Sequence, residues 1–155
     1  MKKKFTNLYL ENQLCFPLYA ASRLTTKLYA PHLKKLDITY PQYLVLLILW
    51  EHQTQSVSEI GQQLMLESNT LTPLLKRLEQ KEIIQRNRSN KDERTVIISL
   101  TKAGENLKEQ AAVIPEKIMG SFRDDNISDT EVAAFEKTLL SLVKILKEKS
   151  TKNEE

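Results

Sequence analysis

The chain has 155 residues, of which 41% are hydrophobic and 28% are charged, a composition typical of an ordinary globular domain. Its longest uninterrupted apolar run, Tyr43–Trp50, is much shorter than the ~18 residues that a bilayer-spanning helix needs. Polar residues, and not the apolar segment of a signal peptide, follow the basic N-terminus. We therefore expect a single domain, residues 1–155, in the cytoplasm and with no membrane partner.

The residues that could carry metal or catalytic chemistry are few. A lone cysteine, Cys15, excludes an internal disulfide and an all-cysteine metal site. The two histidines, His32 and His52, offer little for a metal site or a histidine-based triad. No P-loop or dinucleotide fingerprint occurs. We expect no metal, no cofactor and no enzyme activity.

Two helices are predicted in the first third of the chain. The first covers residues 8–29; Pro17 should bend it just after Cys15 unless the helix begins near there, and Pro31 should end it. A connector from His32 to Asp37 follows. The second helix, about 40–52, begins with the capping box Thr39 to Gln42 and is apolar almost all round, which places it in the core.

A helix-turn-helix layout comes next. Ser56 and Glu59 form a capping box that opens a short helix, and Gly61 in that helix indicates close approach of another helix. The second helix, 68–80, is expected to begin with Ser68 as its N-cap and to turn four leucines to the core. Taken alone, such a segment is more often an ordinary amphipathic surface helix. The candidate DNA-binding residues here are Ser68, Asn69, Thr70, Thr72, Pro73, Lys76 and Arg77.

A basic hairpin is predicted directly after this helix. Residues 83–88 and 94–99 are rich in β-branched side chains, and residues 89–93 between them have turn chemistry. Residues 76–100 carry seven basic and four acidic groups, a balance of +3 that equals the net charge of the whole chain. The hairpin can serve as a wing that contacts the DNA backbone or minor groove. Its candidate DNA-binding residues are Arg86, Arg88, Lys91, Asp92 and Arg94.

Two long helices should complete the chain. Thr101 caps the first, which Pro115 should kink, and a capping box from Ser128 to Glu131 opens the second. The charged tail from Lys147 is expected to fray. These helices carry more apolar surface than a small winged core can cover, so we predict a homodimer that binds a palindromic site in double-stranded DNA.

Two motifs extend this interpretation to a family. Asp92-Glu-Arg94, followed by Val96–Thr101, resembles the wing signature of the MarR family of winged-helix repressors, and Ser68–Glu79 is similar to the family's recognition helix. The resemblance covers nearly the whole chain. It implies a mainly α fold with a small β-wing, a winged helix-turn-helix at about 39–101, dimerisation helices at about 8–30 and 102–149, and a pseudo-palindromic operator.

A narrower resemblance lies in the first helix. Gln13–Arg23 looks like the one-cysteine form of the organic-hydroperoxide-sensing branch, although Pro17 is unusual for it. The resemblance implies a reactive Cys15, assisted by the phenols of Tyr29 and Tyr40, with Tyr19 also fitting the branch. The effector would then be an organic hydroperoxide, and a low-molecular-weight thiol is a candidate partner of the oxidised cysteine.

Two other functions remain open from the residues. A repressor of the same family could respond to a small aromatic or acidic ligand, with Cys15 structural, because free cysteines are usually buried packing residues. A thiol peroxidase is the third hypothesis, but the chain has no second cysteine to resolve a sulfenic acid. Operator binding with and without an organic hydroperoxide, for the natural protein and for Cys15→Ser, separates the three.

Overall fold

A computed structural model describes residues 5–90, 92–122 and 127–152 of the chain, without the side chains of 151 and 152. The chain forms two compact units, residues 1–114 and 115–155. The first unit contains α1–α5 and a three-stranded antiparallel sheet, so the fold is mainly helical with a small β component, as predicted. Among the described residues, no helix combines the length and apolar character needed to cross a membrane.

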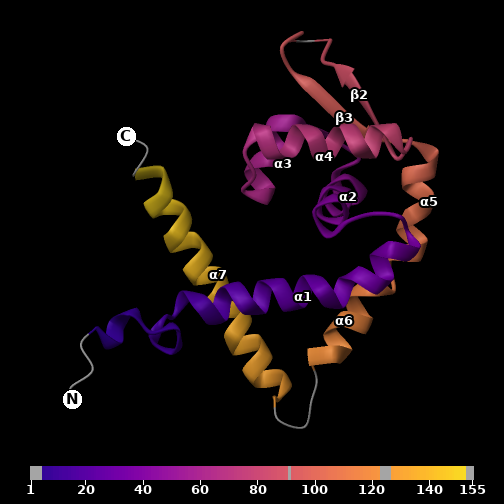
Figure 1. Cartoon of the computed structure of the whole chain (residues 1–155). Coiled ribbons are helices and arrows are strands. Elements are labelled where there is room, and N and C mark those ends of the chain that lie inside the picture. Colours follow the sequence, from indigo (N-terminus) through magenta and orange to yellow (C-terminus); the bar gives the residue numbers. More distant parts are fainter. Residues whose placement is uncertain (1–4, 91, 123–126, 153–155) are drawn as a thin grey trace. The chain divides into compact units, whose positions relative to one another are not determined.

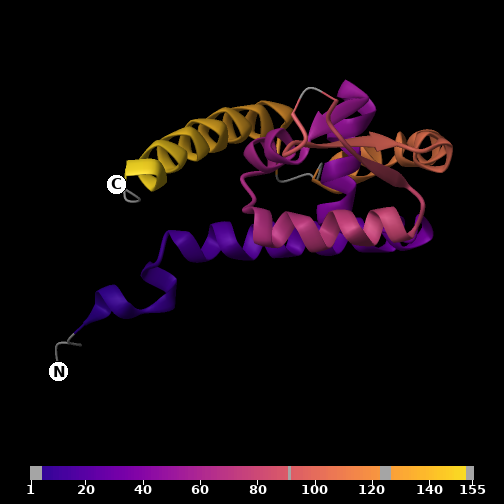
Figure 2. The ribbon, with the colours of Figure 1, turned by 90° about the horizontal axis from the view of Figure 1, so that it is seen from above.

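Helix α1 spans Cys15–Lys35 and can be followed as one continuous element in Figures 1 and 2. Short 3-10 turns at Thr6–Leu8 and Leu10–Asn12 precede it, so the expected start at residue 8 is wrong. The helix begins at Cys15 because this position puts Pro17 in the first turn, where the missing N–H has no intrahelical partner to lose.

The end of α1 was also predicted wrongly, because the helix passes through Pro31 and the expected connector is helical as far as Lys35. Asp37 terminates the helix in the left-handed conformation, with φ 52°. The N–H of Asp37 donates to the carbonyl of Lys34, and the N–H of Ile38 donates to the carbonyl of Leu33. These are the two bonds of a Schellman motif, which satisfies the last carbonyls of the helix.

Helix α2, Tyr40–His52, lies at the centre of the first unit. Its capping box is present as predicted, and the Gln42 side chain accepts the N–H of Thr39 at 2.9 Å. Val45, Leu46 and Leu49 are fully buried, as predicted for a core helix, but Leu47 is 40% exposed, so α2 is not covered on every side. It contacts α1, α3, α4 and α5, and Figure 1 shows it between α1 and the α3–α4 pair.

Helices α3, Val57–Leu64, and α4, Ser68–Gln80, form the predicted helix-turn-helix. The Ser56–Glu59 capping box is confirmed, with bonds of 2.7 and 3.2 Å. A Cβ on Gly61 would lie 3.0 Å from the carbonyl oxygen of Leu66 in the turn and 3.6 Å, an ordinary contact distance, from Leu71 of α4, so the turn and not the second helix comes closest to Gly61. The N-cap of α4 is Glu67 and not Ser68, which is its first helical residue.

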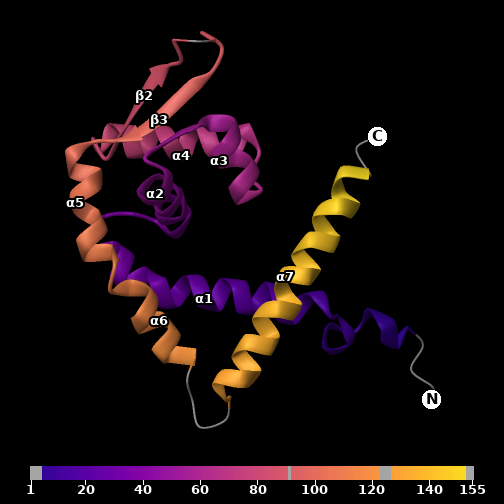
Figure 3. The same cartoon turned by 180° about the vertical axis from the view of Figure 1, so that it is seen from behind.

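The wing consists of β2, Ile84–Arg88, and β3, Val96–Leu100, and Figure 3 shows the hairpin from behind. A third strand, β1 at Thr54–Ser56, pairs with β3 and gives the strand order β1-β3-β2. This strand was missed because Thr-Gln-Ser shows no apolar alternation. It is a strand because it pairs with β3, which lies more than forty residues later in the chain, and not because of its local propensity.

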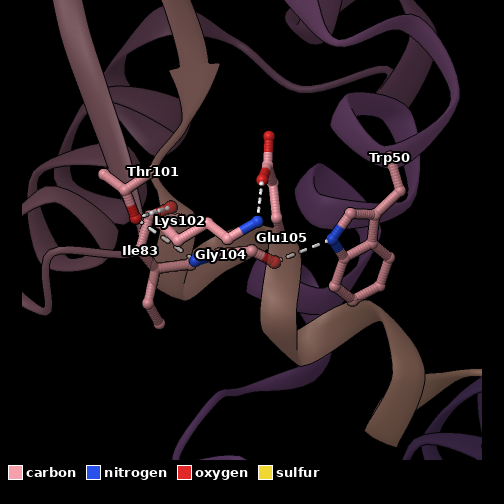
Figure 4. Close-up of polar contacts among 6 residues, drawn as sticks. All are labelled: Trp50, Ile83, Thr101, Lys102, Gly104 and Glu105. Carbon is pink, nitrogen blue, oxygen red and sulfur yellow. Dashed lines mark hydrogen bonds and ion pairs between the residues drawn. The ribbon is translucent and has the colours of Figure 1, made fainter.

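The wing joins helix α5, Lys102–Ala111, through a tightly packed junction (Figure 4). The Thr101 hydroxyl accepts the N–H of Gly104 at 3.2 Å, which confirms the predicted cap, and its single proton faces the carbonyl oxygens of Glu82 at 2.5 Å and Ile83 at 3.1 Å. The indole N–H of Trp50 donates to the carbonyl of Gly104 at 2.9 Å. These bonds connect α2, the residues just before β2 and α5.

The remaining helices are α6, Ile114–Phe122, and α7, Asp129–Lys152. The long helix expected here is interrupted after Ala111 and resumes at Ile114, instead of only being kinked. Pro115 has no N–H to donate to the hydrogen bond that would continue the helix. The capping box that opens α7 is confirmed, since the Ser128 N–H donates to Glu131 at 2.9 Å. Helix α7 continues to Lys152, so the tail expected to fray from Lys147 is helical as far as residue 152; residues 153–155 of that tail and residues 124–126 of the expected loop lie outside the described residues.

The capping carboxylates predict a pH dependence of stability. Hydrogen bonds from the backbone and side chain of Ser56 lower the pKa of Glu59 from its ordinary 4.5. A lowered pKa in the folded state means that the stabilisation is present above pH 4.5 and is lost as the pH falls through the folded-state pKa. The free energy of unfolding, measured against pH, should therefore fall less steeply in acid for Glu59→Gln than for the natural protein. Parallel curves would contradict this prediction.

Candidate DNA-binding and redox-sensing site

Helix α4 presents a polar face outward. Leu71, Leu75 and Leu78 are buried, as the leucine pattern predicted, and Leu74 is half-buried. Among the candidate DNA-binding residues of the helix, Thr72 is half-buried and the others are exposed, namely Ser68, Asn69, Thr70, Pro73, Lys76 and Arg77. The Asn69 amide donates to Glu67 at 3.1 Å, and the Thr70 hydroxyl donates to Asn69 at 3.1 Å. Such a face offers amide and hydroxyl groups to base edges and cations to phosphates.

The tip of the wing is organised by Asp92. Its carboxylate accepts the backbone N–H of Arg94 and the hydroxyl of Thr95, both at 3.1 Å, and lies 3.4 Å from the Arg94 Nε. The backbone bond from Arg94 is the main cause that lowers the pKa of Asp92, followed by the bond from Thr95. The Arg94 side chain remains 94% exposed, and Arg88 is exposed as well. Lys91 lies outside the described residues.

The helix-turn-helix and the wing meet on one face. A hollow of about 360 Å³ is lined by the start of α3, by Ser68 and Thr72 of α4, and by Arg86 and Arg94 of the hairpin. Hydroxyl groups and guanidinium groups from three elements therefore converge there. Sequence spacing alone could not show this, because the elements are connected by turns of unknown direction.

Cys15 is the first residue of α1, and its side chain is exposed. Tyr19, one turn later, is also exposed, but its hydroxyl accepts a hydrogen bond from Arg23 at 2.8 Å. The guanidinium also lies 5.6 Å from the centre of the Tyr19 ring. In this chain Tyr19 therefore interacts with Arg23.

Tyr29 and Tyr40 lie together, with ring centroids 4.8 Å apart. Tyr43 completes the cluster at 5.8 Å from Tyr29 and 6.4 Å from Tyr40, and its other side meets Trp50 at 6.2 Å. Burial raises the pKa of Tyr29, and Tyr40 raises it further, so the phenol stays protonated at neutral pH and can donate a hydrogen bond. Tyr43 was not predicted as a member of this cluster, although its helical spacing from Tyr40 was a usable signal.

The cysteine and the tyrosine pair are far apart within one chain. Cys15 and Tyr29 belong to the same helix, and fourteen residues correspond to about 21 Å along its axis at 1.5 Å per residue. A hydrogen bond from Tyr29 to the sulfur therefore requires a second copy of the chain. No cluster of three or more metal-ligating side chains occurs among the residues that the structure describes.

Comparison with known proteins places these features in a family. A family model described as transcriptional regulator SarA/Rot matches residues 27–111. The organic hydroperoxide resistance transcriptional regulator of Bacillus subtilis is 51% identical over 150 residues, which cover 97% of this chain and all of the relative.

Solved structures of DNA-binding proteins are similar to this chain as well. Reduced AbfR bound to DNA, a protein of Staphylococcus epidermidis, is 42% identical, with a TM-score of 0.71 and coverage of 88% of this chain and 94% of AbfR. An Escherichia coli MarR mutant in complex with operator DNA has a TM-score of 0.78, covering 90% of this chain and 99% of MarR; at 22% identity it supports the fold alone.

The winged helix-turn-helix fold is thus confirmed, and the class is that of transcriptional regulators and not of enzymes. The chain belongs to the MarR family, on the branch that contains the organic hydroperoxide resistance regulator.

Proposed function

We propose that this protein is a dimeric repressor that leaves its operator when an organic hydroperoxide oxidises Cys15. The observation that carries the proposal is the meeting of Tyr29 and Tyr40 at 4.8 Å, about 21 Å from Cys15 along α1. A two-fold dimer can place this tyrosine pair against the partner's cysteine. The 51% identity to an organic hydroperoxide resistance regulator and the DNA complex of the similar AbfR support the same function.

In the DNA-bound state, α4 enters the major groove and the wing lies along the backbone or in the minor groove. The exposed Asn69, Thr70 and half-buried Thr72 read base edges, and Lys76, Arg77 and Arg94 contact phosphates or the minor groove. Two copies related by a two-fold axis match two half-sites of a pseudo-palindromic operator, about one helical turn or a multiple apart.

The chemistry is a two-electron oxidation. The Cys15 thiolate attacks one oxygen of the hydroperoxide, the O–O bond breaks, an alcohol leaves, and the sulfur becomes a sulfenic acid. The chain has no second cysteine, so the sulfenic acid condenses with a low-molecular-weight thiol and releases water, cyclises to a sulfenamide, or is oxidised further. Each product adds volume or polarity at the subunit junction, where close packing tolerates little change.

The test is operator binding by the reduced protein, with and without an organic hydroperoxide, together with peroxide consumption over many turnovers. We expect tight binding that the hydroperoxide abolishes and a thiol reductant restores, with about one peroxide consumed per subunit. Binding that is insensitive to hydroperoxide but lost with a small aromatic acid would favour the ligand-responsive alternative. Sustained peroxide turnover without DNA binding would favour a peroxidase.

Arg94 should make the largest electrostatic contribution of the wing. It is 94% exposed and is oriented by Asp92, so Arg94→Ala should weaken binding and reduce the log–log dependence of affinity on salt by about 0.9 for each phosphate that is no longer neutralised. Fluorescence anisotropy at several salt concentrations measures both quantities. Asp92→Asn is the matched variant: it keeps Arg94 but weakens its orientation, so we expect lower affinity with a nearly unchanged salt dependence. An unchanged affinity in Arg94→Ala would exclude this role.

Tyr29 and Tyr40 should tune the thiol. A protonated phenol that donates to sulfur stabilises the attacking sulfur anion, so Tyr29→Phe and Tyr40→Phe should slow the oxidation of Cys15 while reduced operator binding persists. The rate of sulfenic acid formation, measured against pH, tests this. Tyr19→Phe is the comparison variant, because its hydroxyl bonds Arg23. Slower oxidation in Tyr19→Phe, with no change in the other two variants, would assign the role to Tyr19. Rate profiles identical to that of the natural protein in all three variants would remove the tyrosines from the mechanism.

A further inference from the structure

Arg86 differs from the other arginines of the wing. It lies in the middle of β2 and pairs with Ile98 of β3, which is fully buried. Directly paired residues of an antiparallel sheet point to the same face, and Ile84, two residues earlier, is buried on that face as well. Arg86 is therefore a charged residue on the core-facing side of the hairpin, with a side chain only 22% exposed against 94% for Arg94.

The side chain of Arg86 reaches the recognition helix. Its Nη1 lies 3.7 Å from the carboxylate of Glu79, next to the last residue of α4. Its Nε atom is buried and has no hydrogen-bond partner among the described residues. Arg86 lines both the hollow that it shares with Ser68 and Thr72 and a groove that it shares with Glu79 and Thr101. The side chain thus lies along the junction between α4 and the hairpin.

This arrangement is poorly explained as a contribution to stability. A partly buried guanidinium with an unpaired Nε loses hydration, which costs free energy. An ion pair with a half-exposed carboxylate offsets little of that cost. Buried ion pairs can instead select one geometry among several of similar stability. The arrangement is also unsuited to phosphate binding, because most of the side chain is covered and Glu79 already lies beside its charge.

We propose that Arg86 is a positioning residue that sets the recognition helix α4 relative to the wing, and not a phosphate contact. The inference rests on the proposed DNA binding. With the Arg86–Glu79 contact in place, α4 in the major groove and the wing at the minor groove or backbone are both aligned with the same operator half-site. Without it, either element still binds DNA, but the two no longer match one operator half-site together.

The test compares Arg86→Met, which keeps the length and apolar stem of the side chain, with Arg94→Met as the matched control. The affinities of the reduced proteins for operator and for random-sequence DNA are measured at several salt concentrations. Arg94→Met should lower both affinities and the salt dependence. Arg86→Met should lower operator affinity by about tenfold or more, the effect of one mismatched base pair, with unchanged random-sequence affinity and salt dependence.

A second variant addresses the helix side of the contact and keeps the test decisive if Arg86→Met fails to fold. Glu79→Gln removes an acidic group from a DNA-binding surface, so simple electrostatics predicts tighter binding to every sequence. Positioning predicts the opposite for the operator, namely weaker binding with random-sequence affinity unchanged or higher.

Equal losses for both DNAs with a lower salt dependence in Arg86→Met would make Arg86 a phosphate contact and overturn the proposal. Operator affinity unchanged in Arg86→Met, or increased in Glu79→Gln, would overturn it as well. If the natural protein itself did not distinguish operator from random-sequence DNA, the proposed function, and not the role of Arg86, would be at fault.

Discussion

Replacement of Cys15 by serine should abolish the response to organic hydroperoxide and leave operator binding by the reduced protein intact. The hydroxyl of serine is close in size to the thiol but is not a nucleophile toward peroxide at neutral pH. Cys15 is exposed at the first position of α1, so the substitution removes no buried contact within the chain. Operator binding over a series of hydroperoxide concentrations should give a midpoint for the natural protein and a flat line for Cys15→Ser.

The thiol itself supplies the control for this prediction. The thiol should be alkylated at neutral pH faster than the cysteine of a short unfolded peptide. Release of Cys15→Ser by hydroperoxide at the same midpoint as the natural protein would transfer the sensing to another residue. A thiol that reacts no faster than the peptide cysteine would make Cys15 a packing residue and favour the ligand-responsive repressor.

Gly104→Ala should produce the largest loss of stability among single substitutions of glycine. A Cβ at this position would clash with the carbonyl oxygen of Ile83 and would lie 3.0 Å from Leu100 Cδ2. The first of these is a backbone atom at the start of the wing and cannot move without displacing β2 (Figure 4). Overpacking of this kind costs about 1–3 kcal/mol, and we expect the upper end, because the Trp50 bond to Gly104 must shift as well.

Gly120→Ala is the matched control, because a Cβ there meets no atom within 4 Å. Gly120 lies inside α6, where alanine is favoured over glycine by up to ~1 kcal/mol, so this variant should be as stable as the natural protein or slightly more stable. Urea unfolding of both variants measures the difference in free energy. Equal stability of Gly104→Ala and the natural protein would mean that the α5–wing junction adjusts at no cost.

The sequence predicted the wing residues but not their separate environments. Arg86, Arg88 and Arg94 were all predicted as basic hairpin residues, yet Arg86 is mostly covered and lies beside Glu79, whereas Arg94 is almost fully exposed beside Asp92. Alternation along a strand shows which residues share a face, but it does not show which face meets α4. That choice depends on the direction in which the chain returns after the turn at residue 81.

Local rules succeeded wherever the interaction spans a few residues. The capping boxes at Thr39, Ser56 and Ser128 and the cap at Thr101 were predicted correctly, since each joins a side chain to a backbone group three residues away. The prolines predicted the helix boundaries less well, because the effect of a proline depends on its position in the helix. Pro17 falls in a first turn that needs no donor, and Pro31 lies inside α1, which continues to Lys35.

The sequence by itself determined the family, the helix-turn-helix and wing, and the candidate cysteine, because capping boxes, periodicity and motifs are properties of neighbouring residues. Only the tertiary structure decided that Tyr29 meets Tyr40 and Tyr43, that Thr54–Ser56 forms a strand, and that Arg86 reaches Glu79. Each of these contacts joins residues that no single helix or strand brings together. They form when burial of α2 draws α1, α4 and the wing around it, and that packing is a property of the whole first unit.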